Sequence, residues 1–330
     1  MISHSPSTSA SALPWLLEPD PDNPAIRYFI LTDLLERPAD DRELQEAKAA
    51  IMTSGPVPAI LDAQHPVGYW VKPGGGYSPK YRSTIWQIIF LAELGADAGD
   101  ARVQRGCEYV LEHSIAANGA FSCYQKPVPS CAILCLNGNL LWAMMQLGFG
   151  EDDRVQTALN WLARAITGAD DFRYLKSGTC GPGFCCSANE WQSCGWGANK
   201  AMRALLAVPD HQHTSAIQNA LDLGADFLLS HDPAVADYPH TQRVSSTWFK
   251  LGFPLTYWSD VLETVQNLVD LGYGDDPRLT NAIQFVLDKQ DAQGRWKLEN
   301  GLKGKMWSDI EQKGRPSKWI TLRALRMFRS

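Results

Sequence analysis

Two kinds of helical segment alternate along the chain. Residues 133–148, ILCLNGNLLWAMMQLG, are apolar almost all round, which is typical of a helix buried on every side. Residues 152–166, DDRVQTALNWLARAI, have one apolar stripe and one polar face. The alternation therefore predicts pairs made of one buried and one amphipathic helix.

These pairs recur at intervals of roughly 50 to 60 residues. The buried helices are predicted to start near Ser83, Leu134, Ser193, Leu255 and Ser317. An irregular pair over residues 24–37 and 40–54 precedes them. Five or six such pairs predict an all-α protein, a single (α/α)5-6 toroid with two concentric rings of helices over residues 21–330. An open helical solenoid is the alternative, but it would leave one side of the buried helices in water.

Capping residues support these boundaries. Acidic residues at Asp100, Asp153 and Asp276 stand where the amphipathic helices should begin, and Pro277 suits a first helical position. Glycines at the ends of the Leu-Gly pairs, Gly95, Gly148 and Gly272, are expected to cap the buried helices in the left-handed conformation.

The pattern Q-x-x-x-G-x-W occurs twice, as QHPVGYW at residues 64–70 and as QDAQGRW at residues 290–296. Gly119 and Phe121 are similar to a decayed third copy. Placed between paired helices, the pattern resembles the QW signature of the squalene and terpene cyclase group, over roughly residues 20 to 330. That group shares its α/α toroid with protein prenyltransferase β subunits and linalool dehydratase/isomerase. The resemblance implies that Gln64, Trp70, Gln290 and Trp296 tie helix ends together and are not catalytic.

The resemblance gives the fold more firmly than the reaction. Cyclases that begin by protonating an alkene carry an Asp-x-Asp-Asp motif, which this chain lacks. The Asp-x-Cys pattern of the prenyltransferase zinc site is absent as well. The similarity to linalool dehydratase/isomerase implies acid–base lyase or isomerase chemistry without an organic cofactor.

Composition narrows the possible partners and surroundings. The net charge is −6 and no block of basic residues is present, which argues against nucleic acid and anionic membranes. No apolar run approaches the roughly 20 residues of a membrane span. No secretion signal is recognisable, so we expect a cytoplasmic protein with mostly reduced thiols. The first 20 residues, rich in Ser, are expected to form a flexible arm.

Long loops precede each buried helix, so they should gather at one mouth of the toroid, where we expect the site. Seven of the eight Cys lie in two of these loops or just after them. Four thiolates from neighbouring loops can hold zinc tetrahedrally. The best candidates as zinc ligands are Cys135, Cys180, Cys185 and Cys194, with Cys123, Cys131 and Cys186 as substitutes. Inert buried thiols and reactive thiols are the alternatives.

The fourth long loop combines acid–base groups with aromatic residues. Asp260, in the first turns of an otherwise apolar helix, should face the funnel, where desolvation would raise its pKa. The alternative is a helix cap paired with Arg243 or a Lys. His240 and Tyr257 are the other catalytic candidates. A substrate pocket would be lined by Trp86, Tyr77, Trp248, Trp258, Arg243 and Trp196.

The sequence thus predicts an enzyme that binds a small hydrophobic substrate, isoprenoid-like or aromatic, in a central cavity. Asp260 and His240 would serve as acid and base. A zinc–thiolate transferase or hydrolase and a non-catalytic binding or scaffold toroid are the alternatives. A homodimer or a partner subunit is compatible with any of the three.

Overall fold

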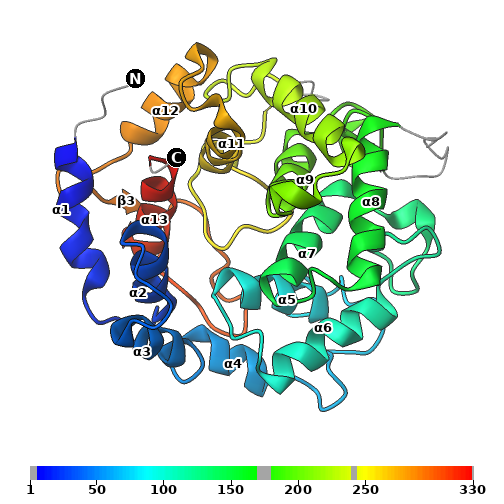
Figure 1. Ribbon diagram of the computed structural model, residues 1–330, viewed down its shortest axis with the longest axis horizontal. Coiled ribbons are helices and arrows are strands. Elements are labelled where there is room, and N and C mark those ends of the chain that lie inside the picture. Colours follow the sequence, from blue (N-terminus) through cyan, green and yellow to red (C-terminus); the bar gives the residue numbers. More distant parts are fainter. Residues whose placement is uncertain (1–5, 169–179, 239–243, 329–330) are drawn as a thin grey trace.

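The computed structural model describes residues 6–168, 180–238 and 244–328, and it forms two concentric rings of helices (Figure 1). The inner ring contains α2 (Ala25–Phe29), which continues as the π-helix η1 (Ile30–Leu34), α5 (Thr84–Glu93), α7 (Leu134–Gln146), α9 (Gly195–Leu206), α11 (Val261–Leu268), which continues as the π-helix η5 (Val269–Tyr273), and α13 (Lys318–Met327). The outer ring contains α1 (Pro6–Leu17), α3 (Arg42–Ile51), α4 (Pro56–Asp62), α6 (Ala101–His113), α8 (Asp153–Thr167), α10 (Ser215–Leu229) and α12 (Thr280–Leu287). The described parts of the chain thus build an inner ring of six helices and an outer ring of seven, with α3 and α4 both between α2 and α5, which confirms the predicted all-α toroid.

Short elements occur in the connections between these helices. Two antiparallel ladders pair β1 (Cys180–Gly181) with β2 (Cys185–Cys186), and β3 (Trp296–Lys297) with β4 (Pro316–Ser317). Single 3-10 turns are η2 (Pro129–Cys131), η3 (Ser187–Asn189), η4 (Asp210–Gln212) and η6 (Pro277–Leu279), the last of which leads into α12.

The two rings bury their residues as the hydrophobic pattern predicts. In α5 every residue from Thr84 to Ala92 is buried, because α5 has neighbours on all sides. The contact between α7 and α9 is especially close. A Cβ on Gly138 would lie only 2.3 Å from the backbone carbonyl of Lys200, so glycine is required where these two helices meet.

The predicted caps are present, with one shifted position. Asp100 and Asp276 accept hydrogen bonds from backbone N–H groups at the starts of α6 and η6. In α8 the cap is Asp152, one residue before the predicted Asp153. The three predicted C-terminal glycines have positive φ angles, 70° at Gly95, 87° at Gly148 and 88° at Gly272.

The two Q-x-x-x-G-x-W copies make the same contacts in different repeats. The indole N–H of Trp70 donates to the carbonyl of Ile60 at 2.7 Å, and that of Trp296 donates to the carbonyl of Val286 at 2.6 Å. Both acceptors lie in outer helices, ten residues before the tryptophan. Each tryptophan backbone N–H also donates to a threonine hydroxyl on the next inner helix, at 3.0 and 3.1 Å. Each tryptophan therefore fastens an outer helix to the following inner helix.

The glutamines of the two copies differ. The Gln64 amide donates to the backbone carbonyl of Arg102 at 2.9 Å, at the start of α6. Gln290 makes no such side-chain bond within the described residues. In the decayed third copy, the backbone of Phe121 exchanges two hydrogen bonds with the Asn137 side chain of α7, at 2.8 and 2.9 Å. An asparagine on the inner helix thus holds the third copy in place.

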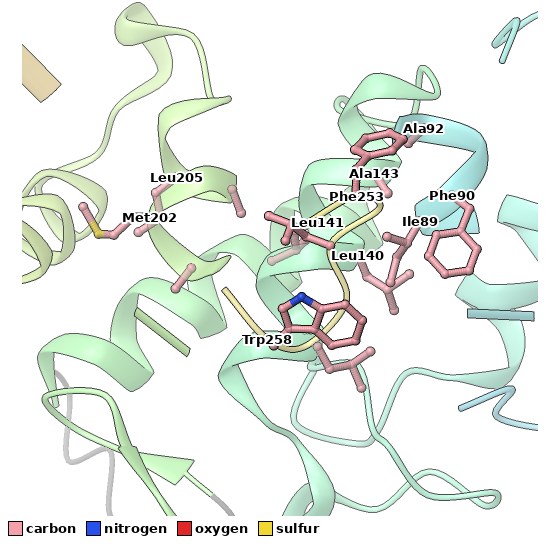
Figure 2. Packing of buried hydrophobic residues seen from close by; sticks show 14 of the residues in the cluster. Ile89, Phe90, Ala92, Leu140, Leu141, Ala143, Met202, Leu205, Phe253 and Trp258 are labelled. Atoms are coloured by element: carbon pink, nitrogen blue, oxygen red, sulfur yellow. The ribbon is translucent and has the colours of Figure 1, made fainter. Parts of the chain in front are cut away.

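The inside of the ring is crossed by residues 252–260, which we call the crossing segment (Figure 1). Its residues are buried except for the partly buried Tyr257. Figure 2 shows Phe253 and Trp258 of this segment beside Leu140 and Leu141 of α7. A hydrogen bond of 2.8 Å from the Asn139 amide of α7 to the Thr256 carbonyl fixes it there. The crossing segment therefore fills much of the space that an open funnel would occupy.

The expectation of a flexible arm over the first 20 residues is wrong for much of that range. Residues 6–17 form α1, in which Ala12 and Leu16 are fully buried. The carbonyl of Leu17 accepts a hydrogen bond of 2.6 Å from Arg27 of α2. This stretch of small and apolar residues is therefore the outer partner of the first inner helix.

None of the helices described is both long enough and apolar enough to cross a bilayer.

Candidate functional site

A cavity of about 640 Å³ lies inside the ring, at the end where the inner helices terminate. Ligand pockets in proteins commonly measure about 300–1,000 Å³. Each of the six inner helices contributes a residue of its C-terminal part. They are Asp33, Glu93, Gln146, Leu206, Asp270 and Arg326.

The prediction that the site lies at the N-terminal ends of the inner helices does not agree with this cavity. The crossing segment and an aromatic cluster described below occupy that side of the ring. Loop lengths in the sequence indicate which side of the ring carries the long loops. They do not show that the crossing segment turns into the ring.

Four aromatic residues line the cavity. Phe253 of the crossing segment stacks on Trp319 of α13, with ring centroids 4.0 Å apart and planes 9° apart. Phe29 meets the edge of the same indole at 6.1 Å. On the opposite wall, Trp142 lies under the guanidinium of Arg203, at 3.4 Å from the ring centroid. These faces provide apolar contact area and π-electron density.

Most of the charged groups that line the cavity are joined in ion pairs. Arg203 holds Glu93 through two contacts of 2.5 and 3.2 Å, and Arg326 binds Asp33. Burial alone would favour the protonated form of Glu93, but Arg203 outweighs it and keeps the pKa of this carboxyl below its usual value. Glu93 is therefore ionised at neutral pH.

A buried lysine–glutamate pair contributes a carboxylate to the same cavity. The Nζ of Lys200 lies 2.7 and 2.8 Å from the two carboxylate oxygens of Glu263. Lys200 is 0% exposed and Glu263 is 5% exposed, and only Glu263 lines the cavity. Burial lowers the pKa of Lys200 despite the nearby carboxylate. A buried acid–base pair with one member facing a cavity is a common arrangement at catalytic sites.

Asp260 has a structural environment that differs from the predicted one. Its carboxylate caps α11 by accepting the backbone N–H of Glu263 at 2.8 Å. It also accepts hydrogen bonds of 2.9 Å from both terminal nitrogens of Arg323. Burial favours protonation, but Arg323 and two backbone N–H groups prevail and lower the pKa of Asp260. The predicted rise in pKa is therefore wrong. The expected alternative, a cap paired with a cation, describes the residue, although the cation is Arg323.

Several of the predicted pocket residues do come together, at the N-terminal side of the ring. Tyr257 lies within 6.5 Å, centroid to centroid, of Trp86, Trp196 and Trp258. Tyr77 packs against Trp86 at 5.3 Å. The ammonium of Lys80 sits 4.0 Å from the Tyr257 ring and 5.1 Å from the Tyr77 ring, so the chain's own cation covers this cluster.

The remaining predicted residues are placed elsewhere or are not described. Trp248 is 2% exposed, packs on Tyr238, and donates its indole N–H to the carbonyl of Pro233 at 2.9 Å. This is a packing role in the loop after α10. His240 and Arg243 lie outside the described residues.

The predicted zinc ligands do not form a metal site. In the parts of the chain that the structure describes, no three His, Cys, Asp or Glu side chains are grouped to hold a metal ion. Cys180 donates its thiol hydrogen to the carbonyl of Ala132 at 3.2 Å, and burial raises its pKa to about 12. Cys194 caps α9, and its hydrogen bond to Cys186 lowers the pKa of Cys186 to about 6. The described thiols thus interact with one another and with backbone groups, and they are not grouped as a four-thiolate zinc site.

Sequence reasoning missed the charged residues that line or support the cavity. The buried inner helices contain four charged residues among their apolar ones: Glu93, Lys200, Arg203 and Glu263. A charged residue in the middle of a helix with no solvent-exposed face needs a partner, and that signal was available in GANKAMRALL and VLETVQNL. Asp260 was selected as a catalytic candidate because it lies at the start of an apolar helix.

Comparisons with known proteins give a likeness of shape only. No family model matches the sequence, and no curated protein matches it. A protein from Actinoplanes is similar over 98% of both chains, with 15% identity and a TM-score of 0.48. The type II terpene cyclase MstE from Scytonema has 14% identity and a TM-score of 0.47 over 97% of this chain and 96% of its own. The GH76 α-mannanase BT2949 from Bacteroides thetaiotaomicron has 14% identity and a TM-score of 0.39, over 74% of this chain and 67% of its own. Such values assign neither an activity nor a substrate to this chain.

Proposed function

We propose that the protein is an enzyme that binds a small, largely hydrophobic substrate in the cavity at the C-terminal ends of the inner helices. The chemistry would be acid–base lyase or isomerase chemistry, with Glu263 as the group that exchanges a proton with the substrate. The observation that carries this proposal is the Lys200–Glu263 pair, whose glutamate faces a cavity lined by four aromatic residues.

The surroundings of Glu263 suit a reaction in which positive charge develops on an apolar molecule. Aromatic faces attract cations, as the Arg203–Trp142 contact already illustrates within the cavity. Helix C-termini carry partial negative charge, and six of them end around this space. Glu93 stays ionised beside Arg203, so it would add to the field without taking part in proton transfer.

Lys200 would act as the counter-charge of Glu263 during the reaction. When Glu263 accepts a proton from the substrate, the buried ammonium of Lys200 loses its counter-charge, which favours return of that proton to the substrate. The pair could thus remove a proton at one substrate atom and return it at another. That exchange is what an isomerase or a dehydratase requires.

The test is to screen for turnover and then change the carboxylate. The purified chain would be incubated with linalool, geraniol, farnesol and cinnamyl alcohol, and the products analysed by gas chromatography and mass spectrometry. Glu263→Gln keeps the size and one hydrogen bond to Lys200, and we expect it to lower kcat by about 100-fold or more. Glu299→Gln is the matched control, since Glu299 pairs with Lys289 at 2.8 Å outside the cavity. Equal loss in both variants, or full activity in Glu263→Gln, would exclude the assigned role.

A non-catalytic binding role is the second candidate. Its specific support is that Asp33, Glu93 and Glu263 are all engaged with cations, which leaves few groups ready for chemistry. This alternative predicts that one of the same alcohols raises the melting temperature without being converted. Because no turnover would occur, Glu263→Gln should change only the Kd for that alcohol.

A further inference from the structure

Three loops on the side opposite the cavity form one continuous surface, which we call the basic loop patch: residues 71–82, 122–128 and 303–309. The backbone N–H of Gly75 donates a hydrogen bond of 2.9 Å to the carbonyl of Gln125, and this bond joins the first two loops. Arg82 donates to the carbonyls of Met306 and Gly304 at 3.2 and 3.4 Å, which joins the first and third. All three loops precede inner helices, whereas the cavity lies where those helices end.

The charge of this patch is opposite to that of the whole chain. The chain has a net charge of −6, yet the patch holds the basic residues Lys72, Lys80, Arg82, Lys126, Lys303 and Lys305 and the single acidic residue Asp309. The Asp309 carboxylate accepts the backbone N–H of Gly304 at 2.7 Å. Among the residues described, Lys72, Lys126, Lys303 and Lys305 are exposed and form no ion pair. Their positive charges are therefore available to an anionic partner at this face.

Apolar side chains are exposed between these lysines. Tyr124 is 59% exposed, Val71 is 50% exposed and Trp307 is 37% exposed. Val71 has a φ of 69°, which is a strained conformation for a β-branched residue. A valine held outward at such a cost is unusual, and it stands directly beside Lys72.

Other exposed large apolar residues concentrate on the same side. Val67, Trp191 and Val235 also lie in loops between an outer helix and the next inner helix, whereas Leu223 of α10 lies on the outer ring. Scattered apolar residues on a surface need no explanation, but a set that shares one face with unpaired lysines does.

We propose that the basic loop patch docks on an anionic lipid surface. Lysines attract the charged headgroups, and Val71, Tyr124 and Trp307 enter the boundary between headgroups and acyl chains. Nucleic acid fits less well. Phosphates gain nothing from Val71, and Trp307 already packs its ring against Arg82 at 5.3 Å, which leaves it poorly placed to stack on a base. The docked face lies opposite the cavity, so this surface is independent of the function proposed above.

Vesicle sedimentation tests the proposal with the full chain. The two probes are vesicles of phosphatidylcholine and vesicles in which a third of the lipid is phosphatidylserine. We expect binding to the second and little to the first, with release as the salt concentration rises. Because each basic residue near such a surface contributes roughly a fivefold increase in affinity, Lys72→Glu together with Lys126→Glu should weaken binding at least about 25-fold.

Two further variants separate the contributions. Arg42→Glu with Lys48→Glu reverses two exposed charges on the outer helix α3 and should change binding less than threefold. Tyr124→Ser removes an exposed ring and should weaken binding to the anionic vesicles without altering the salt dependence. Circular dichroism would verify that each variant is folded. Salt-dependent binding of the unaltered chain can be measured even if a variant fails to fold.

Several results would overturn the proposal. Absence of binding to anionic vesicles would do so directly, as would equal binding to both lipid mixtures. Equal loss in the α3 variant would show that only overall charge matters. If duplex DNA competes the protein off the vesicles and Tyr124→Ser binds them normally, the patch serves a nucleic acid and the lipid assignment is wrong.

Discussion

Replacing Asp260 by Asn would test whether this carboxylate is structural. The native carboxylate accepts four hydrogen bonds, two from Arg323 at 2.9 Å and one each from the backbone N–H groups of Gly252 and Glu263 at 3.0 and 2.8 Å. Asn caps helices as well as Asp does, so the bond to Glu263 should survive. The substitution therefore removes the counter-charge of Arg323 while it preserves the cap.

The expected cost follows from the burial of the pair. Arg323 is 14% exposed in its side chain and Asp260 is 0% exposed. Leaving one member of a buried ion pair unpaired typically costs about 3–5 kcal/mol of stability. The carbonyl of Gly252, which Arg323 also contacts at 2.7 Å, limits the loss to the lower part of this range. We therefore expect the free energy of unfolding to fall by about 3 kcal/mol.

Urea denaturation followed by circular dichroism would measure this loss, and a pH series would identify its origin. The pKa of Asp260 is lowered in the folded protein, so the ion pair stabilises the fold fully above the unfolded pKa of about 4. That contribution is lost as the pH falls through the lower, folded pKa. The difference between native protein and variant should be constant above about pH 5 and should shrink below about pH 4.

A loss below about 1 kcal/mol at pH 7 would refute this reasoning. It would mean that the carboxylate is hydrated and exchangeable, as an exposed ion pair is. Asp260 would then become available again as an acid–base group. Asp276→Asn is the matched control, because Asp276 pairs with Arg278 on the surface and its loss should destabilise the fold clearly less than the loss of Asp260.

Three further predictions test packing and thiol chemistry. Trp296→Phe should lower the free energy of unfolding by about 1–3 kcal/mol, measured by urea denaturation, because the bond from the indole N–H to the Val286 carbonyl is lost; no loss would contradict the stapling role. Labelling with iodoacetamide and peptide mass spectrometry should find Cys186 modified first, with a rate that rises through about pH 6, and Cys107 unmodified because burial raises its pKa; equal rates would contradict this. Gly138→Ala should destabilise the fold by about 3 kcal/mol or prevent folding, since its Cβ would meet the α9 backbone at 2.3 Å. Gly150→Ala, whose nearest contact is 3.7 Å, should be tolerated in the same urea denaturation assay.

The ring architecture could be predicted from the sequence because its signals are local. The stripe of α8, the all-round apolar character of α7 and the glycines after three of the inner helices depend only on neighbouring residues. The tryptophan staples were recognisable because the same pattern recurs at Trp70 and Trp296. Local periodicity and repetition thus sufficed for the fold.

The candidate site could not be placed in the same way. Which end of the ring holds a cavity depends on how a loop of irregular structure fills the other end, and nothing local in GFPLTYWSD shows that it turns inward. Partners across the ring are also invisible in the sequence. Asp260 was expected to face the funnel, with a helix cap paired with Arg243 or a Lys as the alternative, but its partner Arg323 lies 63 residues further along the chain. The net charge likewise does not reveal that the lysines of three separate loops gather on one face.

The closure of the ring has a consequence for how the protein unfolds. The first and last repeats are joined directly: the indole of Trp319 donates to Asn23 at 2.9 Å, Lys318 donates to the carbonyl of Glu18 at 3.1 Å, and Arg326 pairs with Asp33. Linear repeat arrays fray from their terminal repeats, which have a neighbour on one side only. Here the described repeats have no such end. Amide protons of the first and last inner helices should therefore exchange as slowly as those of α7, and the six repeats should lose their protection together.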